Sequence, residues 1–211
     1  TFLLKGVPRK VVLRREFAEI SNPIEFEMDE SIAGHKVGYI KLKEFNAIVA
    51  DKVKEAILQL KAKGADEFVL DLRGNGGGAF QSALNTAGLF MNEKVITNMV
   101  DGEGGKVTFK SSKDAILLDS PLVVWIDRKS ASASEVLSGA LQDNCRAVLI
   151  GKRSFGKGLI QAVYGLMDGS GLILTVARYE TPKGTNIQGT GILPDIETNS
   201  SKLNHRVDQS A

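Results

Sequence analysis

The most constraining feature of this 211-residue chain is a stretch around residue 130 in which two short apolar runs each end in a polar turn. The first run, Leu122–Ile126, ends at Asp127 and opens into the turn RKSASASE, after which apolar residues recur at helical spacing. The second run, Ala147–Ile150, breaks into GKRSFGKG and resumes as the strand-like LIQAVYGL. This pattern predicts a strand, a turn and a helix, with serines after the first strand and the glycine-flanked Lys157 after the second.

The upstream sequence alternates between strand and helix in the same way. Val37–Phe45 is typical of a strand, and a helix is expected to follow it, with Asn46 at its N-cap and Gly64 at its end. Glu67–Arg73 has the pattern of a buried strand, and the loop GNGGG leads from it into a second expected helix, Ala79–Met91. This βαβ rhythm predicts a mixed, largely parallel sheet in an α/β fold.

The chain is predicted to form one core domain with two appendages. With 43% hydrophobic and 25% charged residues, 211 residues can bury the core of one α/β domain. We expect this core at residues 24–198, opening with a strand at Ile24–Asp29. Residues 1–23 are interpreted as a lead-in with a short strand at Lys10–Glu16, and residues 199–211 as a polar tail.

Charge and cysteine content exclude several classes of function. The 27 basic and 25 acidic residues give a formal net charge of +2 without a basic stripe, so we expect no nucleic-acid partner. No apolar run is long enough to span a bilayer, so we expect no integral membrane segment. The single cysteine, Cys145, rules out an internal disulfide framework and a cysteine-rich metal site.

A serine nucleophile in the RKSASASE turn would need a base other than histidine. The two histidines are His35, in a loop before a strand, and His205, in the tail, so a histidine base would require the fold to bring His35 across. Lysine is a chemically plausible substitute, but only when burial keeps its amine neutral. Lys157 lies between two glycines and ahead of an apolar run, whereas Lys152 adjoins Arg153, so we expect Lys157 to be the buried lysine.

Ser132 has two interpretations from its position. Together with Glu135 it matches the S-x-x-E capping box, in which the serine caps the helix and the glutamate reaches back. A nucleophile would also be favoured there, because the free amides and the dipole at a helix N-terminus stabilise an oxyanion. The neighbouring serines Ser130, Ser134 and Ser138 remain candidates by the same argument.

The glycine-rich loops also allow a nucleotide-binding interpretation. Gly74, Gly76 and Ala79 fit the G-x-G-x-x-A dinucleotide pattern, although no acidic partner follows about 20 residues on. A glycine nest can equally bind an oxyanion or a carboxylate. GKRSFGKG resembles a P-loop but has Gly158 in place of the magnesium-binding hydroxyl, and a strand rather than a helix is expected after it.

Taken together, four motifs resemble the tail-specific, or carboxyl-terminal processing, serine protease family. They are LDLRGNGGG at 70–78, SASASEVLSGALQDNCRAVLIG at 130–151, SFGKGLIQ at 154–161 and TVARYETPKGTNIQGTGILPD at 175–195. The resemblance implies Ser132 as nucleophile, Lys157 as general base and Gln161 as a residue that orients the lysine. It also implies an oxyanion hole from the amide of Ala133 and an amide of the glycine cluster.

The glycine of the implied oxyanion hole is either Gly77 or Gly78. Asp143 matches a position that other family members treat as important, but we interpret it as a structural hydrogen-bonding residue at the end of a helix. The family's fold is similar to the crotonase and caseinolytic-protease spiral of β-β-α units. The implied serine–lysine chemistry needs no metal or other cofactor.

Two departures from the family pattern concern substrate recruitment and the nucleophile turn. Members carry a PDZ domain that grips the substrate's C-terminus, whereas here only Lys10–Glu16 could be a remnant of one. Members also often have glycine where this chain has Lys129. The sequences of the ARYETPKG and LQDN segments most resemble those of plastid and cyanobacterial members, which trim a photosystem II reaction-centre protein.

The resulting hypothesis is a serine endopeptidase that cleaves near the C-terminus of protein substrates, in the thylakoid lumen or a bacterial periplasm. The alternative is a catalytically inactive core or assembly module that lacks its PDZ recruitment domain. Nucleotide binding is the third hypothesis.

Overall fold

The computed structural model describes residues 2–4, 7–9, 12, 14, 20–30 and 34–198. Its central element is a six-stranded sheet with the strand order β12-β9-β8-β5-β4-β3. In chain order these strands are β3 (Ile24–Asp29), β4 (Val37–Leu42), β5 (Glu67–Asp71), β8 (Leu122–Ile126), β9 (Val148–Gly151) and β12 (Ile196–Glu197). Only β3 runs antiparallel to its neighbour, so the predicted α/β fold with a mixed, largely parallel sheet is confirmed.

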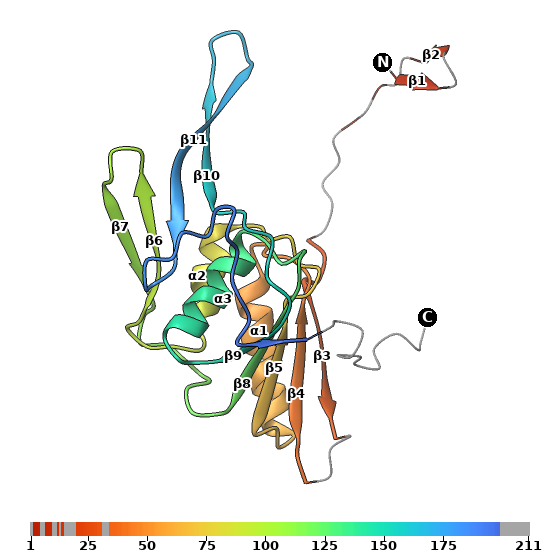
Figure 1. The fold of residues 1–211 in the computed structure, drawn as a ribbon. Coiled ribbons are helices and arrows are strands. Elements are labelled where there is room, and N and C mark those ends of the chain that lie inside the picture. Colours follow the sequence, from red (N-terminus) through yellow and green to blue (C-terminus); the bar gives the residue numbers. More distant parts are fainter. Residues whose placement is uncertain are drawn as a thin grey trace.

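Helices α1 (Val49–Ala62), α2 (Phe80–Gly88) and α3 (Ala133–Asp143) pack against one another beside this sheet (Figure 1). The N-cap of α1 is Ile48 rather than the expected Asn46, whose side-chain oxygen instead accepts the Ile48 N–H at 3.2 Å. Gly64 follows the helix with φ +96°, a conformation that glycine adopts without strain, and it ends α1 as expected.

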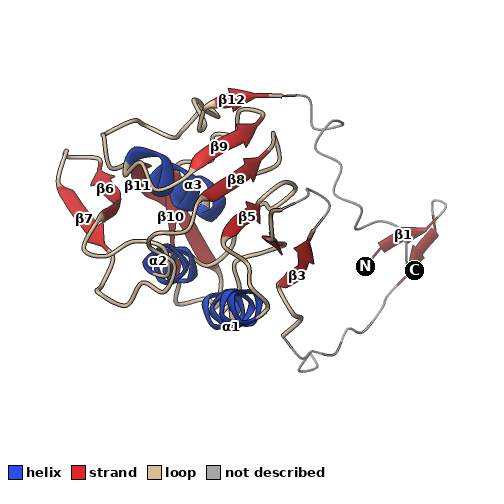
Figure 2. Cartoon of the chain, turned by 90° about the horizontal axis from the view of Figure 1, so that it is seen from below, coloured by secondary structure: helices blue, strands red, loops and turns tan. Residues whose placement is uncertain are grey.

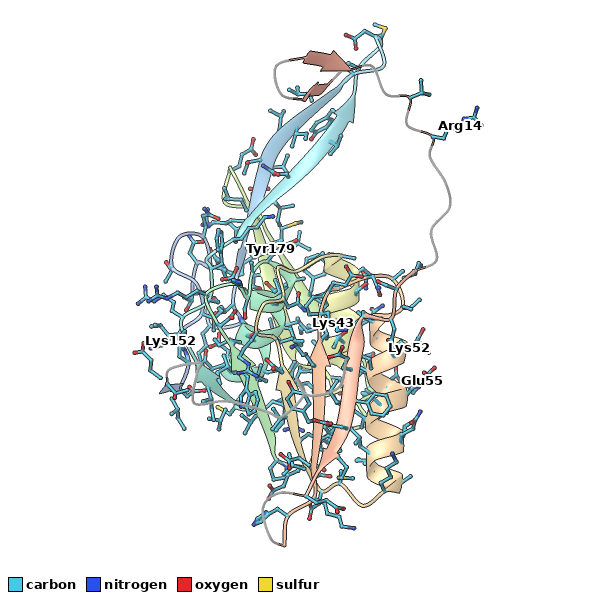
Figure 3. All side chains as sticks on the ribbon, turned by 90° about the vertical axis from the view of Figure 1, so that its right-hand side faces the viewer. Arg14, Lys43, Lys52, Glu55, Lys152 and Tyr179 are labelled. Atoms are coloured by element: carbon cyan, nitrogen blue, oxygen red, sulfur yellow. The ribbon has the colours of Figure 1, made fainter. Side chains whose placement is uncertain are left out.

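A second, antiparallel sheet has the order β10-β11-β6-β7 and lies on the other side of α2 and α3 (Figures 1 and 2). Its strands are β6 (Val95–Asp101), β7 (Lys106–Lys110), β10 (Leu159–Gly165) and β11 (Gly171–Glu180). The β10–β11 hairpin extends well beyond the body of the domain, with Tyr179 at its base (Figure 3). The ring of Tyr179 stacks on Phe80 at 4.9 Å, which fastens this sheet to the start of α2.

Strands β1 (Phe2–Leu4) and β2 (Val7–Arg9) form a short antiparallel hairpin. Most of the strand expected at Lys10–Glu16, the tail at 199–211 and His205 lie outside the described residues. The division into lead-in, core and tail therefore stays a prediction.

The end of β5 is anchored by a buried carboxylate just before the glycine-rich loop. Asp71 is fully buried and accepts the Tyr39 hydroxyl at 2.6 Å and the Arg73 guanidinium at 2.7 Å. Burial, together with the hydrogen bond and the negative charge of Asp71, raises the pKa of Tyr39. The Arg73 guanidinium lies 4.6 Å from the ring centre of Trp125 on β8, so the two strands are joined where the loops begin.

Candidate active site

Three loops that follow the parallel strands β5, β8 and β9 meet beyond the carboxyl ends of these strands, because parallel neighbours end on the same side of the sheet. The first contact is between loops one and two, where the Ala131 N–H donates to the Asn75 carbonyl at 3.0 Å. The third loop joins them through Phe155, whose N–H donates to the Ser130 carbonyl at 2.9 Å. The GNGGG, SASAS and SFGKG motifs, distant in sequence, therefore form one cluster.

Ser132 has the backbone conformation of a strained turn at the head of α3. Its φ and ψ are 56° and −115°, a region that residues other than glycine rarely occupy and that costs about 1–3 kcal/mol. Such strain persists where the surrounding structure enforces it, often at an active site. The predicted capping-box pairing with Glu135 is also present, so cap and nucleophile are compatible roles for Ser132.

The neighbouring serines are buried, and their hydroxyls are committed to carbonyl groups. Ser130 donates to the Leu72 carbonyl at 2.8 Å, and Ser138 donates to the Ser134 carbonyl at 2.7 Å. Ser134 donates to the carbonyl of Asn75, in the GNGGG loop, at 3.0 Å. All three are 0% exposed, whereas Ser132 is half-buried, so Ser132 is the accessible serine of this cluster.

The glycine loop is held by Asn75 and lies against Ser132. The Asn75 side chain donates to the Leu42 carbonyl at 2.9 Å and accepts the Gly77 N–H at 2.8 Å. A β-carbon built on Gly77 would lie 2.9 Å from the Ser132 Cβ and 3.1 Å from the Ala133 nitrogen. The Gly77 amide is thus occupied.

Two other amides remain available, that of Ala133 directly after Ser132 and that of Gly78 directly after Gly77. Within the described part of the chain, the N–H groups of Gly78 and Ala133 have no hydrogen-bond acceptor. Amides of this kind can stabilise a developing oxyanion when they point at the reacting carbonyl.

The side chain of Lys157 is exposed, so the expectation that Lys157 is a buried lysine is wrong, although its flanking glycines Gly156 and Gly158 are buried. These glycines serve close backbone packing instead. Gly156 has φ +89° and its carbonyl accepts the Gly189 N–H at 3.0 Å, while a β-carbon on Gly158 would collide with the Gln188 backbone. Among the described residues, no hydrogen bond or ion pair involves the Lys157 amine.

Gln161 occupies an exposed position on β10, beside an irregularity in the pairing with β11. Its side chain makes no hydrogen bond to Lys157 in the described structure. The orienting role of Gln161 therefore stays a prediction.

His35 lies at the amino ends of the parallel strands, whereas Ser132 lies beyond their carboxyl ends. Its ring nitrogen is 3.1 Å from the carboxylate of Glu67, the first residue of β5, whereas Ser132 follows the last residue of β8. Since β5 and β8 are parallel, these positions are separated by the length of the strands. His35 is therefore not a base for Ser132 in this arrangement.

Asp143 has the structural role that was expected. As the last residue of α3, it accepts the Lys183 N–H at 2.9 Å. Two residues that build the site were not singled out from the sequence, namely Asn75 and Asp127. Asp127 accepts the N–H groups of Gly74 and Lys129 at 3.0 and 2.9 Å, and the available signal was a polar residue directly at a strand end.

Among the described residues, no group of three or more histidine, cysteine, aspartate or glutamate residues is arranged to hold a metal ion. In the same part of the chain, none of the helices has the length and apolar character needed to cross a bilayer.

Comparison with known proteins identifies the family. The profile described as peptidase family S41 matches residues 36–198. The chain is 44% identical over 189 residues to the carboxyl-terminal-processing protease of Synechocystis sp., covering 90% of this chain and 44% of that protein. It is also 44% identical over 195 residues to chloroplastic carboxyl-terminal-processing peptidase 1 of Arabidopsis thaliana, covering 90% and 39%.

A solved structure of a photosystem II D1 C-terminal processing protease superposes with a TM-score of 0.83 at 36% identity, covering 89% of this chain and 51% of the other. The chain spans less than half the length of the two curated relatives named above. The resemblance found in the sequence motifs is confirmed, and the chain belongs to peptidase family S41.

Proposed function

We propose that this chain is the catalytic core of a serine endopeptidase that cleaves near the C-terminus of protein substrates. The observation that carries the proposal is the strained backbone of Ser132, an accessible serine at the head of a helix, next to the Ala133 amide that has no acceptor in the described part of the chain. Membership of a peptidase family supports it. The names of the relatives, which are carboxyl-terminal-processing enzymes, support the position of cleavage.

The proposed chemistry uses Ser132 as nucleophile and Lys157 as general base. The neutral amine of Lys157 takes the hydroxyl proton while the Ser132 oxygen attacks the substrate carbonyl. The protonated amine then gives this proton to the departing amine of the cleaved peptide, leaving an acyl-enzyme. Water attacks the ester with the same base, which releases the acid and restores the Ser132 hydroxyl.

The proposed oxyanion hole consists of the Gly78 and Ala133 amides. Gly77 is the poorer of the two glycine candidates because its N–H is already bonded to the Asn75 side chain. Bound substrate would shield the exposed Lys157 side chain from water, as base catalysis by an amine requires. Gln161 would then orient the lysine from the start of β10.

The biological setting is proposed on the same basis. We infer a protein of photosystem II as substrate and the thylakoid lumen as compartment, with a bacterial periplasm as the alternative. Support comes from the cyanobacterial and chloroplastic relatives and from the superposed structure, which is that of a photosystem II D1 processing protease. No cofactor is required by the proposed chemistry.

The test is hydrolysis of an unstructured peptide with a free carboxyl terminus by the purified chain, followed by mass spectrometry, alongside labelling with a fluorophosphonate. We expect cleavage and labelling by the native chain and neither by Ser132→Ala. Hydrolysis by Ser132→Ala at the native rate would overturn the proposal.

The exposed side chain of Lys157 favours one second candidate, a core that cannot cleave because its dyad is not aligned. A folded chain that reacts with no peptide and no fluorophosphonate would establish this alternative instead.

A further inference from the structure

The buried carboxylate of Glu135 connects the chain segments that carry Ser132 and Lys157. Its Oε2 accepts the Ser132 N–H and the Lys157 N–H, each at 2.8 Å. Its Oε1 accepts the Ser154 hydroxyl and the Gly156 N–H, each at 2.6 Å. Glu135 itself is 0% exposed. One side chain therefore holds the nucleophile turn and the SFGKG loop together.

The hydrogen bonds at this position call for a side chain with two acceptor oxygens. A buried charge is costly unless hydrogen bonds satisfy it, and here both oxygens of Glu135 receive two donors each. A neutral amide offers only one acceptor oxygen and would direct an NH₂ group at two of those donors.

The contact with Ser132 also affects the amides around the nucleophile. Glu135 bonds the Ser132 N–H, and the next amide along the chain, that of Ala133 at the start of α3, has no acceptor among the described residues. The same carboxylate thus fixes the backbone of the nucleophile directly before the unpaired Ala133 amide.

We propose that Glu135 is a positioning residue that sets the geometry between the Ser132 hydroxyl and the Lys157 amine, an inference that rests on the proposed function. The Glu135 carboxylate bonds neither the Ser132 hydroxyl nor the Lys157 amine. It acts through the backbone of both dyad members. Its loss would displace the reacting groups, and a displacement of about 1 Å can lower the rate about 10²-fold.

The variants Glu135→Gln and Glu135→Ala test this role. In Glu135→Gln the amide oxygen is expected at the place of Oε2, because the Ser154 hydroxyl can turn to accept from the NH₂ group whereas the Ser132 and Lys157 amides cannot. We expect kcat to fall about tenfold in Glu135→Gln and about 10²-fold in Glu135→Ala, with KM changed less than about twofold. The rate of fluorophosphonate labelling of Ser132 should fall in the same order.

A matched control is Asp195→Asn, which alters a carboxylate that accepts the Leu149 N–H and the Gln142 side chain. Leu149 lies within β9, and among the described residues the Asp195 carboxylate makes no hydrogen bond to Ser132 or to the loop that carries Lys157. If a loss of stability alone lowered the rate, Asp195→Asn and Glu135→Gln would lower kcat in proportion to their unfolding midpoints, and the proposal would be wrong.

Hydrogen exchange of the native chain gives a second measurement that needs no variant. The amides of Ser132, Gly156 and Lys157 should exchange slowly, although the Lys157 side chain is exposed. Fast exchange at these amides would overturn the inference. Loss of activity in Ser132→Ala with full kcat in Glu135→Gln would defeat the inference alone, whereas full activity in Ser132→Ala would defeat the proposed function.

Discussion

Gly77 lies so close to Ser132 that a β-carbon on the glycine would be 2.9 Å from the serine Cβ. The same β-carbon would be 2.7 Å from the carbonyl oxygen of Ala131, and φ of Gly77 is +100°. Both neighbours belong to the strained turn, so neither can retreat without moving the nucleophile. The glycine loop and the serine turn are therefore fitted to each other.

Gly77→Ala is expected to lower both stability and activity. The strained φ and the two close contacts should reduce the free energy of unfolding by about 1–3 kcal/mol, and displacement of Ser132 should reduce peptide hydrolysis at least about tenfold. Gly76→Ala is the control, because its β-carbon would meet no atom within 4 Å. Urea unfolding and peptide hydrolysis measure the two effects, and equal behaviour of both variants would refute the fitted arrangement.

The serine cluster predicts a separation of activity from stability. Ser132→Ala and Ser132→Gly should both abolish hydrolysis, and the glycine variant should be more stable than the alanine variant by about 1 kcal/mol because glycine adopts φ 56° without strain. Ser134→Ala should keep activity and lose about 0.5–1.5 kcal/mol, since its hydroxyl bonds the buried Asn75 carbonyl. A normal rate in Ser132→Gly would contradict the assignment of the nucleophile.

The proposed base predicts that Lys157→Arg is as inactive as Lys157→Ala. A guanidinium stays protonated at any working pH and cannot accept the hydroxyl proton. Because the side chain of Lys157 is exposed, both variants should unfold within about 0.5 kcal/mol of the native chain. Lys152→Arg is the control, since Lys152 pairs with Glu197 at 3.2 Å and should tolerate the change. Appreciable turnover in Lys157→Arg would rule out Lys157 as the base.

The meeting of the three loops was predictable from sequence because it follows from strand order. The carboxyl ends of parallel neighbours lie on the same side of a sheet. The glycine loop, the serines and Lys157 each follow an apolar run that proved to be such a parallel strand. The local half of the role of Glu135 was also predictable, since S-x-x-E spacing places its carboxylate at the Ser132 N–H. Local spacing was sufficient for these features.

The surroundings of Lys157 were not predictable because they depend on contacts distant in sequence. The flanking glycines and the following apolar run suggested a buried lysine, yet Gly158 packs on Gln188, 30 residues away, and the Lys157 side chain is exposed. The second half of the role of Glu135 depends on Gly156 and Lys157, which lie 21 and 22 residues beyond it. No spacing rule identifies such partners.

The buried phenol of Tyr179 predicts a loss of stability at alkaline pH. Tyr179 is 8% exposed, and burial raises its pKa from 10.0 to about 12. Between these values the unfolded chain loses the phenol proton while the folded chain keeps it, so unfolding becomes easier as pH rises. The free energy of unfolding should therefore fall by about 1.4 kcal/mol per pH unit from this group.

Tyr179→Phe removes this contribution and provides the measurement. Because the Tyr179 hydroxyl has no hydrogen-bond partner within the described structure, the variant should match the native chain at about pH 9 in urea unfolding. At about pH 11 it should be the more stable protein by about 1 kcal/mol. Some decline should persist in the variant, since burial and Asp71 also raise the pKa of Tyr39. Parallel pH profiles of the variant and the native chain would show that Tyr179 ionises equally well in the folded and unfolded states, which its packing against Phe80 argues against.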